Sequence, residues 1–349
     1  MTKSKRNNGH SRSSSMKRTG NEHVEQLTRR RDFLSRSTSV VLAAGAPLGF
    51  RFEDRALLAQ KGEGAALPSA KDEVNSKTGD MPAGKIRDVT ISRLICGGNL
   101  ISGFAHSRDL IYVSSLLKHY FTDKKVHETL ELCERNGIDT AILRLDNDTL
   151  RIITNYWHER GGKIQWIAQI KPAGDDDLTT DTLRALDNGA TGVYLQGGVA
   201  DRFVRRGRVD LIAKALECMK DNAAIAGIAG HDIRVVIECE KAGLEPDFYM
   251  KTINSKQYWS AGPEPRHDSV WAETPEKTIE VMQRVDKPWI GFKVLGAGAI
   301  HPREGFAYAC ENGADFLCVG MFDFQVEEDA RIVREQLAGE IERRRPWRA

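Results

Sequence analysis

Short β-branched runs alternate with amphipathic stretches between residues 87 and 341, and this alternation limits the possible folds more than any other feature. β-branched runs are typical of strands, and apolar residues at i, i+3, i+4 and i+7 are typical of helices. The expected strands are Val89–Cys96, Ile138–Leu143, Ile164–Lys171, Gly192–Gln196, Ile225–Gly230, Phe248–Ile253, Trp289–Leu295 and Phe316–Gly320. The expected helices are 123–136, 146–160, 179–188, 207–221, 232–242, 274–285, 302–312 and 326–341. Eight strand–helix units over 87–341 predict an α/β fold, a single-domain (β/α)8 TIM barrel.

An open, doubly wound sheet is the alternative to a closed barrel. Such a sheet usually carries a G-x-G-x-x-G fingerprint after its first strand. Here the corresponding segment is Cys96-Gly97-Gly98-Asn99-Leu100, which lacks that spacing. The sequence therefore favours the barrel.

The chain before the barrel is expected to be a signal and a linker. Residues 1–46 combine a basic tail with Arg30-Arg31-Asp32-Phe33-Leu34 and a weakly apolar stretch over 39–46. This arrangement resembles a twin-arginine (Tat) signal of bacterial export. We therefore expect the Tat machinery as a partner and the periplasm or cell envelope as the destination. Residues 47–86 are expected to form a linker, and 342–349 a C-terminal tail.

The charge of the chain is uneven, and it bears on the choice of partner. Residues 1–36 carry a net charge of +7 and the whole chain +2, so the remainder carries −5. An acidic body argues against nucleic acid as the main partner. No apolar run approaches the roughly 18 residues of a membrane-spanning helix. The expected partner of the barrel is therefore a small-molecule substrate.

Polar side chains recur at or near the carboxyl ends of the expected strands, where TIM barrels place their active sites. We expect these side chains to surround one pocket: Asp139, Arg144, Lys171, Gln196, His231, Lys251 and Lys293. Two long connections follow strands at the same end of the barrel, 97–122 with an extra helix over Leu110–Tyr120, and 254–273. Long connections there commonly bind substrate. Together with His231, the candidate substrate-binding residues are Asn254, Tyr258 and Trp259.

Glycines near the last two expected strands suggest an anion site. Gly296, Gly298 and Gly320 would let backbone N–H groups approach an anion such as phosphate, although they would equally permit tight turns. The histidines of this half of the chain show no compact ligand spacing. No metal site is therefore predicted.

The barrel resembles a divergent aldo/keto reductase in several short motifs. Gly137-Ile138-Asp139-Thr140-Ala141 matches the Gly and the Asp-Thr-Ala of that family's second strand. Lys171 ends the third strand, as the family's lysine does, and Val294-Leu295-Gly296-Ala297-Gly298 resembles its Pro-Leu-Gly-x-Gly. The resemblance implies an oxidoreductase that acts on a small polar carbonyl or sugar-like substrate. It also implies NADP as cofactor and Asp139 and Lys171 as catalytic residues.

Two positions depart from the catalytic set of that family. Arg144 stands where the family has its catalytic Tyr, and Gln196 where it has a His that orients the carbonyl. Carbonyl reduction needs a group that protonates the forming alkoxide, and an arginine keeps its proton. The guanidinium fork can instead hold a carboxylate or phosphate. No basic cluster follows the last strand to hold a 2′-phosphate, so the sequence leaves the cofactor open and weighs against NADP.

Two lysines suggest a different reaction. Lys251 ends one expected strand and Lys293 lies on the next, which resembles the lysine pair of Schiff-base barrel aldolases. In such a pair one amine forms an imine and the other lowers its pKa by charge repulsion. The two amines would lie close together if both side chains face the barrel interior. Three functions remain open: a remodelled aldo/keto reductase-like enzyme, a Schiff-base lyase using this pair, and a non-catalytic envelope binding protein.

Overall fold

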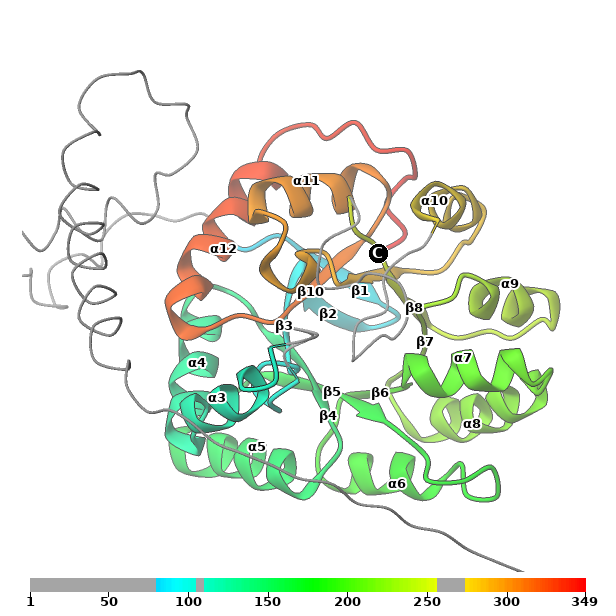
Figure 1. Cartoon of the computed structure of the whole chain (residues 1–349), viewed down its shortest axis with the longest axis horizontal. Coiled ribbons are helices and arrows are strands. Elements are labelled where there is room, and N and C mark those ends of the chain that lie inside the picture. Colours follow the sequence, from blue (N-terminus) through cyan, green and yellow to red (C-terminus); the bar gives the residue numbers. More distant parts are fainter. Residues whose placement is uncertain (1–79, 105–109, 256–273) are drawn as a thin grey trace, which may run out of the picture. The chain divides into compact units, whose positions relative to one another are not determined.

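The structure, a computed structural model, describes residues 80–104, 110–255 and 274–349. These residues form a closed barrel of eight parallel strands in the ring order β10-β3-β4-β5-β6-β7-β8-β9, which confirms the predicted TIM barrel. Figure 1 looks into the barrel, with the helices arranged around the strands. No helix among the described residues is long and apolar enough to cross a membrane.

The elements of the barrel follow the predicted alternation. The barrel strands are β3 (Leu94–Gly97), β4 (Thr140–Arg144), β5 (Gln165–Ile170), β6 (Gly192–Leu195), β7 (Ile225–Gly230), β8 (Phe248–Thr252), β9 (Trp289–Phe292) and β10 (Phe316–Val319). The described helices are α3 (Val113–Tyr120), α4 (Asp123–Arg135), α5 (Asn147–Arg160), α6 (Thr180–Asp187), α7 (Gly197–Arg205), α8 (Val209–Asn222), α9 (Arg234–Lys241), α10 (Pro275–Gln283), α11 (Pro302–Glu311) and α12 (Asp323–Leu337). The extra helix predicted after the first strand is confirmed as α3. Helix α7 was not predicted, because it opens with two glycines, which disfavour helix.

An antiparallel hairpin, β1 (Ala83–Ile86) and β2 (Val89–Ser92), precedes the barrel. Its Ile86 and Ile91 are buried in the same cluster as the residues that fill the barrel interior. The single first strand predicted over Val89–Cys96 is therefore wrong, because the chain turns between β2 and β3. The barrel domain also begins before residue 87, since β1 lies inside the predicted linker.

The strands alternate between two environments, as the pleat of a strand requires. One side chain in two fills the barrel interior, including Ile95, Ile142, Ile167, Tyr194, Ile225, Phe248, Ile290 and Phe316. The intervening side chains pack in the larger cluster between strands and helices. The position of a residue in this alternation therefore shows whether its side chain leaves the strand towards the interior or towards the helices.

The C-terminal segment packs against the end of the barrel at which the strands begin. Arg345 is completely buried, and its Nη1 lies 2.6 Å from Oδ2 of Asp315, the residue before β10. The ring of Trp347 lies between two guanidinium groups, with its centroid 4.1 Å from Cζ of Arg93 and 3.4 Å from Cζ of Arg343. The barrel domain therefore extends beyond the predicted boundary at residue 341.

Candidate functional site

A histidine–aspartate pair lies at the carboxyl end of β7. His231 directly follows this strand, and its Nδ1 lies 2.8 Å from Oδ2 of Asp201, a buried residue of α7. The same carboxylate accepts hydrogen bonds from the backbone N–H groups of His231 and Asp232 at 3.0 and 3.1 Å. A carboxylate can only accept, so Nδ1 carries the proton and Nε2 of the neutral ring is left with a lone pair.

The surroundings favour the neutral form of this imidazole. Burial lowers the pKa of His231, and the charges of Lys293 and Lys251 lower it further, while Asp201 opposes the shift. A Cβ on Gly197 would stand 3.1 Å from the ring, so the glycine lets α7 approach closely. The ring centroid of Phe292 lies 5.4 Å from that of His231. A neutral and fixed imidazole is suited to accept a proton.

A completely buried lysine lies beside this pair. The side chain of Lys251, on β8, is 0% exposed, and its Nζ donates to Oγ1 of Thr252 at 2.6 Å. That hydroxyl donates in turn to the carbonyl oxygen of His231 at 3.2 Å. Burial lowers the pKa of Lys251 to about 7, and Lys293 adds to the shift, whereas Asp201 and Asp232 oppose it. The amine therefore has a lone pair available near neutral pH.

Lys251 leaves β8 on the side of the helices. Tyr249, two residues earlier on the same face, donates its hydroxyl to Oε1 of Glu240 on α9 at 2.7 Å. The register neighbours of Lys251 are two glycines, Gly230 and Gly291. The expectation that Lys251 faces the barrel interior is therefore wrong, although its amine lies at the predicted end of the barrel.

Lys293 follows β9 and completes this group of residues. Its φ of 62° lies in the left-handed region, which is costly for a residue with a side chain and is frequent at functional sites. Its ammonium lowers the pKa values of both His231 and Lys251. Lys293 is partly exposed, whereas Asn254, two residues beyond β8, is buried. The structure thus places His231, Lys251 and Lys293 at the same end of the barrel, where the charge of Lys293 acts on the other two.

Arg144 ends β4, which lies four strands from β8 in the ring, on the opposite side of the barrel. Its Nε lies 2.9 Å from Oδ2 of Asp146, and its guanidinium stacks on Phe104 at 5.0 Å. The two charged side chains are 35% and 33% exposed. The predicted role of Arg144 as the anchor of a substrate anion is not supported, because the chain already supplies a carboxylate to it. Lys171 follows β5 and is exposed.

Asp139 was predicted at the site but lies at the opposite end of the barrel. It immediately precedes β4, and its Oδ1 accepts hydrogen bonds from the backbone N–H of Ser92 at 2.9 Å and from the Thr140 hydroxyl at 2.7 Å. The Asp-Thr-Ala motif that ends a strand in aldo/keto reductases begins one here. Asp139 therefore fixes β4 to the hairpin and takes no part in the site.

Gln196 has a structural role that the sequence did not reveal. It is the N-cap of α7, and its Oε1 accepts a hydrogen bond from the backbone N–H of Val199 at 3.1 Å. This helix carries Asp201, so Gln196 helps to place the His–Asp pair. The predicted catalytic role is replaced by a capping role.

The predicted anion site also differs from expectation. The N–H groups of Gly296 and Gly298 donate to the carbonyl oxygens of Lys293 and Leu295, both at 3.0 Å. They are therefore engaged within a tight turn. Gly320 packs against Leu100, where a Cβ would stand 3.2 Å from a side-chain carbon. These contacts favour the turn interpretation over anion binding.

The residues after β10 do not fit NADP. Helix α12 begins with Asp323, whose Oδ2 lies 3.0 Å from Nζ of Lys125, and Glu327 and Glu328 follow it. Asp323 is thus paired, and the exposed Glu327 and Glu328 stand where a basic cluster would be needed to hold a 2′-phosphate. In residues 80–104, 110–255 and 274–349, no group of three or more His, Cys, Asp or Glu side chains could hold a metal ion.

Tyr258 and Trp259 lie outside the described residues, so their predicted part in substrate binding stays a prediction.

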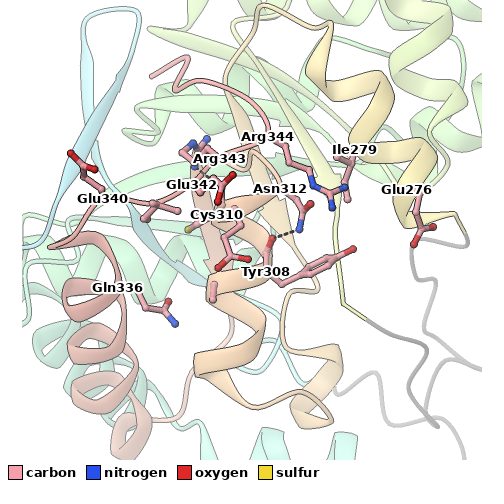
Figure 2. A pocket seen from close by; sticks show the side chains of 13 residues that line it. Glu276, Ile279, Tyr308, Cys310, Asn312, Gln336, Glu340, Glu342, Arg343 and Arg344 are labelled. Atoms are coloured by element: carbon pink, nitrogen blue, oxygen red, sulfur yellow. Dashed lines mark hydrogen bonds between the residues drawn. The ribbon is translucent and has the colours of Figure 1, made fainter.

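A cavity of about 830 Å³ is present away from the residues at the strand ends, between α10, α11 and the segment after α12. Figure 2 shows its lining, in which Tyr308, Arg343 and Arg344 are prominent. The residues that line it do not include His231, Asp201, Lys251 or Lys293, so this cavity is not the mouth of the barrel.

Sequence reasoning missed two residues of the site. Asp201 lies on α7, and without that helix no pattern in the sequence distinguished it from the other aspartates of the chain. Thr252 follows Lys251 directly, and the only available signal was its place at the end of a strand. Both are buried polar residues whose partners come from other elements.

Comparison with known proteins supports the fold. No protein-family model matches the chain, and no curated protein matches its sequence. A Pseudomonas aeruginosa protein assigned to the aldo-keto reductases is 13% identical, with 73% of this chain and 94% of that chain covered and a TM-score of 0.51. An aldo-keto reductase from Bacillus halodurans, in its holo form, is 12% identical, with 74% and 95% covered and a TM-score of 0.50. The chain is thus a TIM barrel with distant structural similarity to aldo-keto reductases.

Proposed function

We propose that the chain is an enzyme that processes a small polar carbonyl compound through an imine formed with its lysine pair, as a Schiff-base lyase does. The observation that carries this proposal is the buried amine of Lys251, whose pKa is lowered to about 7, beside a second lysine and a His–Asp pair. In a lysine pair of an imine-forming enzyme, an amine that is neutral near pH 7 can take the proton from its neighbour and so activate that neighbour as the nucleophile. The neighbours at low sequence identity support the barrel and leave the reaction open.

The two lysines have different parts in this proposal. Lys293 is partly exposed, so a substrate can reach it, and it is assigned to the imine. The buried Lys251 is assigned as the base that exchanges a proton with Lys293. Two amines whose charges act on each other lose their protons in coupled steps, the first at a lowered pKa. Lys251, whose pKa is lowered by burial, acts as the base that accepts a proton from Lys293, which becomes the neutral nucleophilic amine. That amine adds to the carbonyl carbon, and the proton held by Lys251 leaves with the hydroxyl group as water, which gives the protonated imine (C=N⁺).

Ordinary aldo/keto reductase chemistry is less well supported by the same residues. Arg144 replaces the proton-donating Tyr and is paired with Asp146. Asp139 lies at the other end of β4, and Gln196 caps α7. Of the family's catalytic set, only the lysine therefore has a counterpart at the described mouth of the barrel, Lys171.

Reduction with borohydride tests this function. The purified protein is incubated with pyruvate, dihydroxyacetone or glyceraldehyde, then borohydride is added and the adduct is mapped by peptide mass spectrometry. We expect a stable secondary amine on Lys293, its loss in Lys293→Met, and a large decrease in Lys251→Met. Lys220→Met, an exposed lysine of α8, is the matched control. Failure to trap any of the three carbonyl compounds, or trapping equally in both site variants, would contradict the proposal.

Export by the Tat machinery to the periplasm or cell envelope is a separate part of the proposal. It rests on Arg30 and Arg31, which lie outside the described residues. Replacing both by Lys keeps the charge but removes the guanidinium groups. The variant precursor should stay in the cytoplasm when the cell is fractionated. Unchanged envelope localisation would remove the argument for a Tat signal.

A further inference from the structure

The His–Asp pair has a task that imine formation itself does not require. An amine can add to a carbonyl without a histidine at hand, and yet His231 is fixed from several sides. Its Nδ1 meets Asp201 at 2.8 Å, its backbone N–H is held by the same carboxylate at 3.0 Å, and its ring is bounded by Gly197 and Phe292. Such support is typical of a group that exchanges protons in one orientation.

The imidazole of His231 lies near Lys293, so it could exchange a proton with a group bound to that lysine. Phe292, whose ring contacts that of His231, is the residue directly before Lys293. The side chain of His231 is only 16% exposed, so most of the ring is shielded from water. Because Nδ1 is occupied by Asp201, Nε2 is the nitrogen that can accept a proton near an imine on Lys293.

We propose that His231 is the general base that removes a proton from the carbon next to the imine carbon of a Lys293-bound substrate. This inference rests on the proposed function. The C–H bond breaks and its proton passes to Nε2. The electron pair forms a C=C bond, and the C=N⁺ electron pair returns to the Lys293 nitrogen, which gives a neutral enamine and an imidazolium. The imidazolium stays beside Asp201, and no oxidant or reductant is needed.

Asp201 is a positioning residue in this scheme. It holds the tautomer of His231 and stabilises the imidazolium that forms, without touching the substrate. The charged groups that face His231 are Asp201 on α7, Lys251 on β8 and Lys293 after β9. Loss of the Asp201 charge should therefore lower the pKa of the histidine further and displace the pH dependence of proton removal towards lower pH.

Exchange of substrate hydrogen in D₂O separates this proposal from imine formation. Dihydroxyacetone or pyruvate is incubated with the enzyme, and deuterium incorporation next to the carbonyl is followed by proton NMR, in parallel with borohydride trapping. We expect His231→Asn to trap as the wild type does but to exchange about 100-fold or more slowly, the scale of general base catalysis. Asp201→Asn should also trap, exchange more slowly and show the displaced pH profile.

The controls make the outcomes distinct. His158→Asn changes an exposed histidine of α5 and should leave trapping and exchange unchanged. Circular dichroism and thermal unfolding show whether each variant is folded. Wild-type exchange in a folded His231→Asn protein would overturn the assignment of the base. Absence of trapping in the wild-type protein would instead contradict the proposed function.

Discussion

The two ends of the barrel both bury charged side chains, but they surround them differently. Where the strands begin, Asp315 accepts from the guanidinium of Arg345 at 2.6 Å and from two backbone N–H groups, both at 2.9 Å. Where the strands end, Lys251 donates to a hydroxyl and a carbonyl, with another lysine nearby. A buried ion whose charge is balanced stabilises a fold once formed, whereas one beside a like charge is inclined to lose its proton. The first arrangement therefore suits structure and the second suits chemistry.

The largest effect is expected at the end where the strands begin. Asp315→Ala leaves the buried Arg345 and Arg343 without their carboxylate and should lower the free energy of unfolding by about 3–5 kcal/mol. Urea denaturation followed by circular dichroism measures this change. Asp210→Ala, which removes an exposed pair with Arg208, is the control and should cost less than about 1 kcal/mol. Similar losses of unfolding free energy in the two variants would contradict a stabilising role for the buried Asp315–Arg345 pair.

Removal of the Lys251 amine is expected to stabilise the protein at low pH, whereas removal of the Asp315 carboxylate destabilises it. Its folded pKa, about 7, lies below the ordinary value for lysine, so the unfolded chain binds more protons between the two values. The free energy of unfolding should therefore rise with pH from about 7 towards 10 and carry the full penalty below 7. Lys251→Met should abolish this rise and be more stable than the wild type at pH 6. Lys124→Met, at an exposed position, should keep the wild-type profile. A destabilised Lys251→Met protein at pH 6 would show that the amine is structural.

A buried carboxylate in the helical layer provides a third kind of environment. Oδ2 of Asp329, on α12, is buried with no hydrogen-bond partner among the described residues, and burial raises the pKa of Asp329 to about 7. The folded state binds the proton more tightly than the unfolded state, so this group lowers stability as the pH rises from about 4 to about 7. Asp329→Asn should stabilise the protein by about 1–2 kcal/mol at pH 8 and very little at pH 4. Glu327→Gln, at an exposed position of the same helix, should change neither value.

The smallest effect is expected for Gln196. Gln196→Ala removes the cap of α7 and should cost about 1 kcal/mol in unfolding free energy, while borohydride trapping continues at the wild-type level. Thermal unfolding and the trapping assay are measured on the same sample. If trapping fell at least 100-fold while stability changed little, Gln196 would be the carbonyl-orienting residue that the aldo/keto reductase resemblance implies.

Much of the fold could be predicted because the alternation of strands and helices is repeated along the whole barrel. The exceptions have physical causes. The β-branched run Val89–Cys96 conceals a turn at Arg93, since it contains no Gly or Pro to mark where one short strand ends and the next begins. Helix α7 escaped prediction because its first turn is stabilised by the Gln196 side chain and by packing on β7, against the propensity of its glycines.

The sequence could predict only those residues of the candidate site that lie at the carboxyl ends of strands. His231, Lys251 and Lys293 were found because topology alone assigns them to one end of the barrel. Asp139 was misassigned because an Asp-Thr-Ala motif has the same letters at either end of a strand. Asp201 was missed because its importance comes entirely from a tertiary contact with His231.

The ionisation of Lys251 tests the account most directly. Protein labelled with ¹³C at the lysine side chains can be titrated by NMR from pH 5 to pH 11, with Lys251→Met and Lys293→Met used to assign the two site signals. We expect the Lys251 signal to titrate near pH 7, and its midpoint to rise in Lys293→Met, where the neighbouring charge is gone. A Lys251 midpoint near the ordinary lysine value, unchanged by Lys293→Met, would contradict the claim that these two residues form a reactive amine pair.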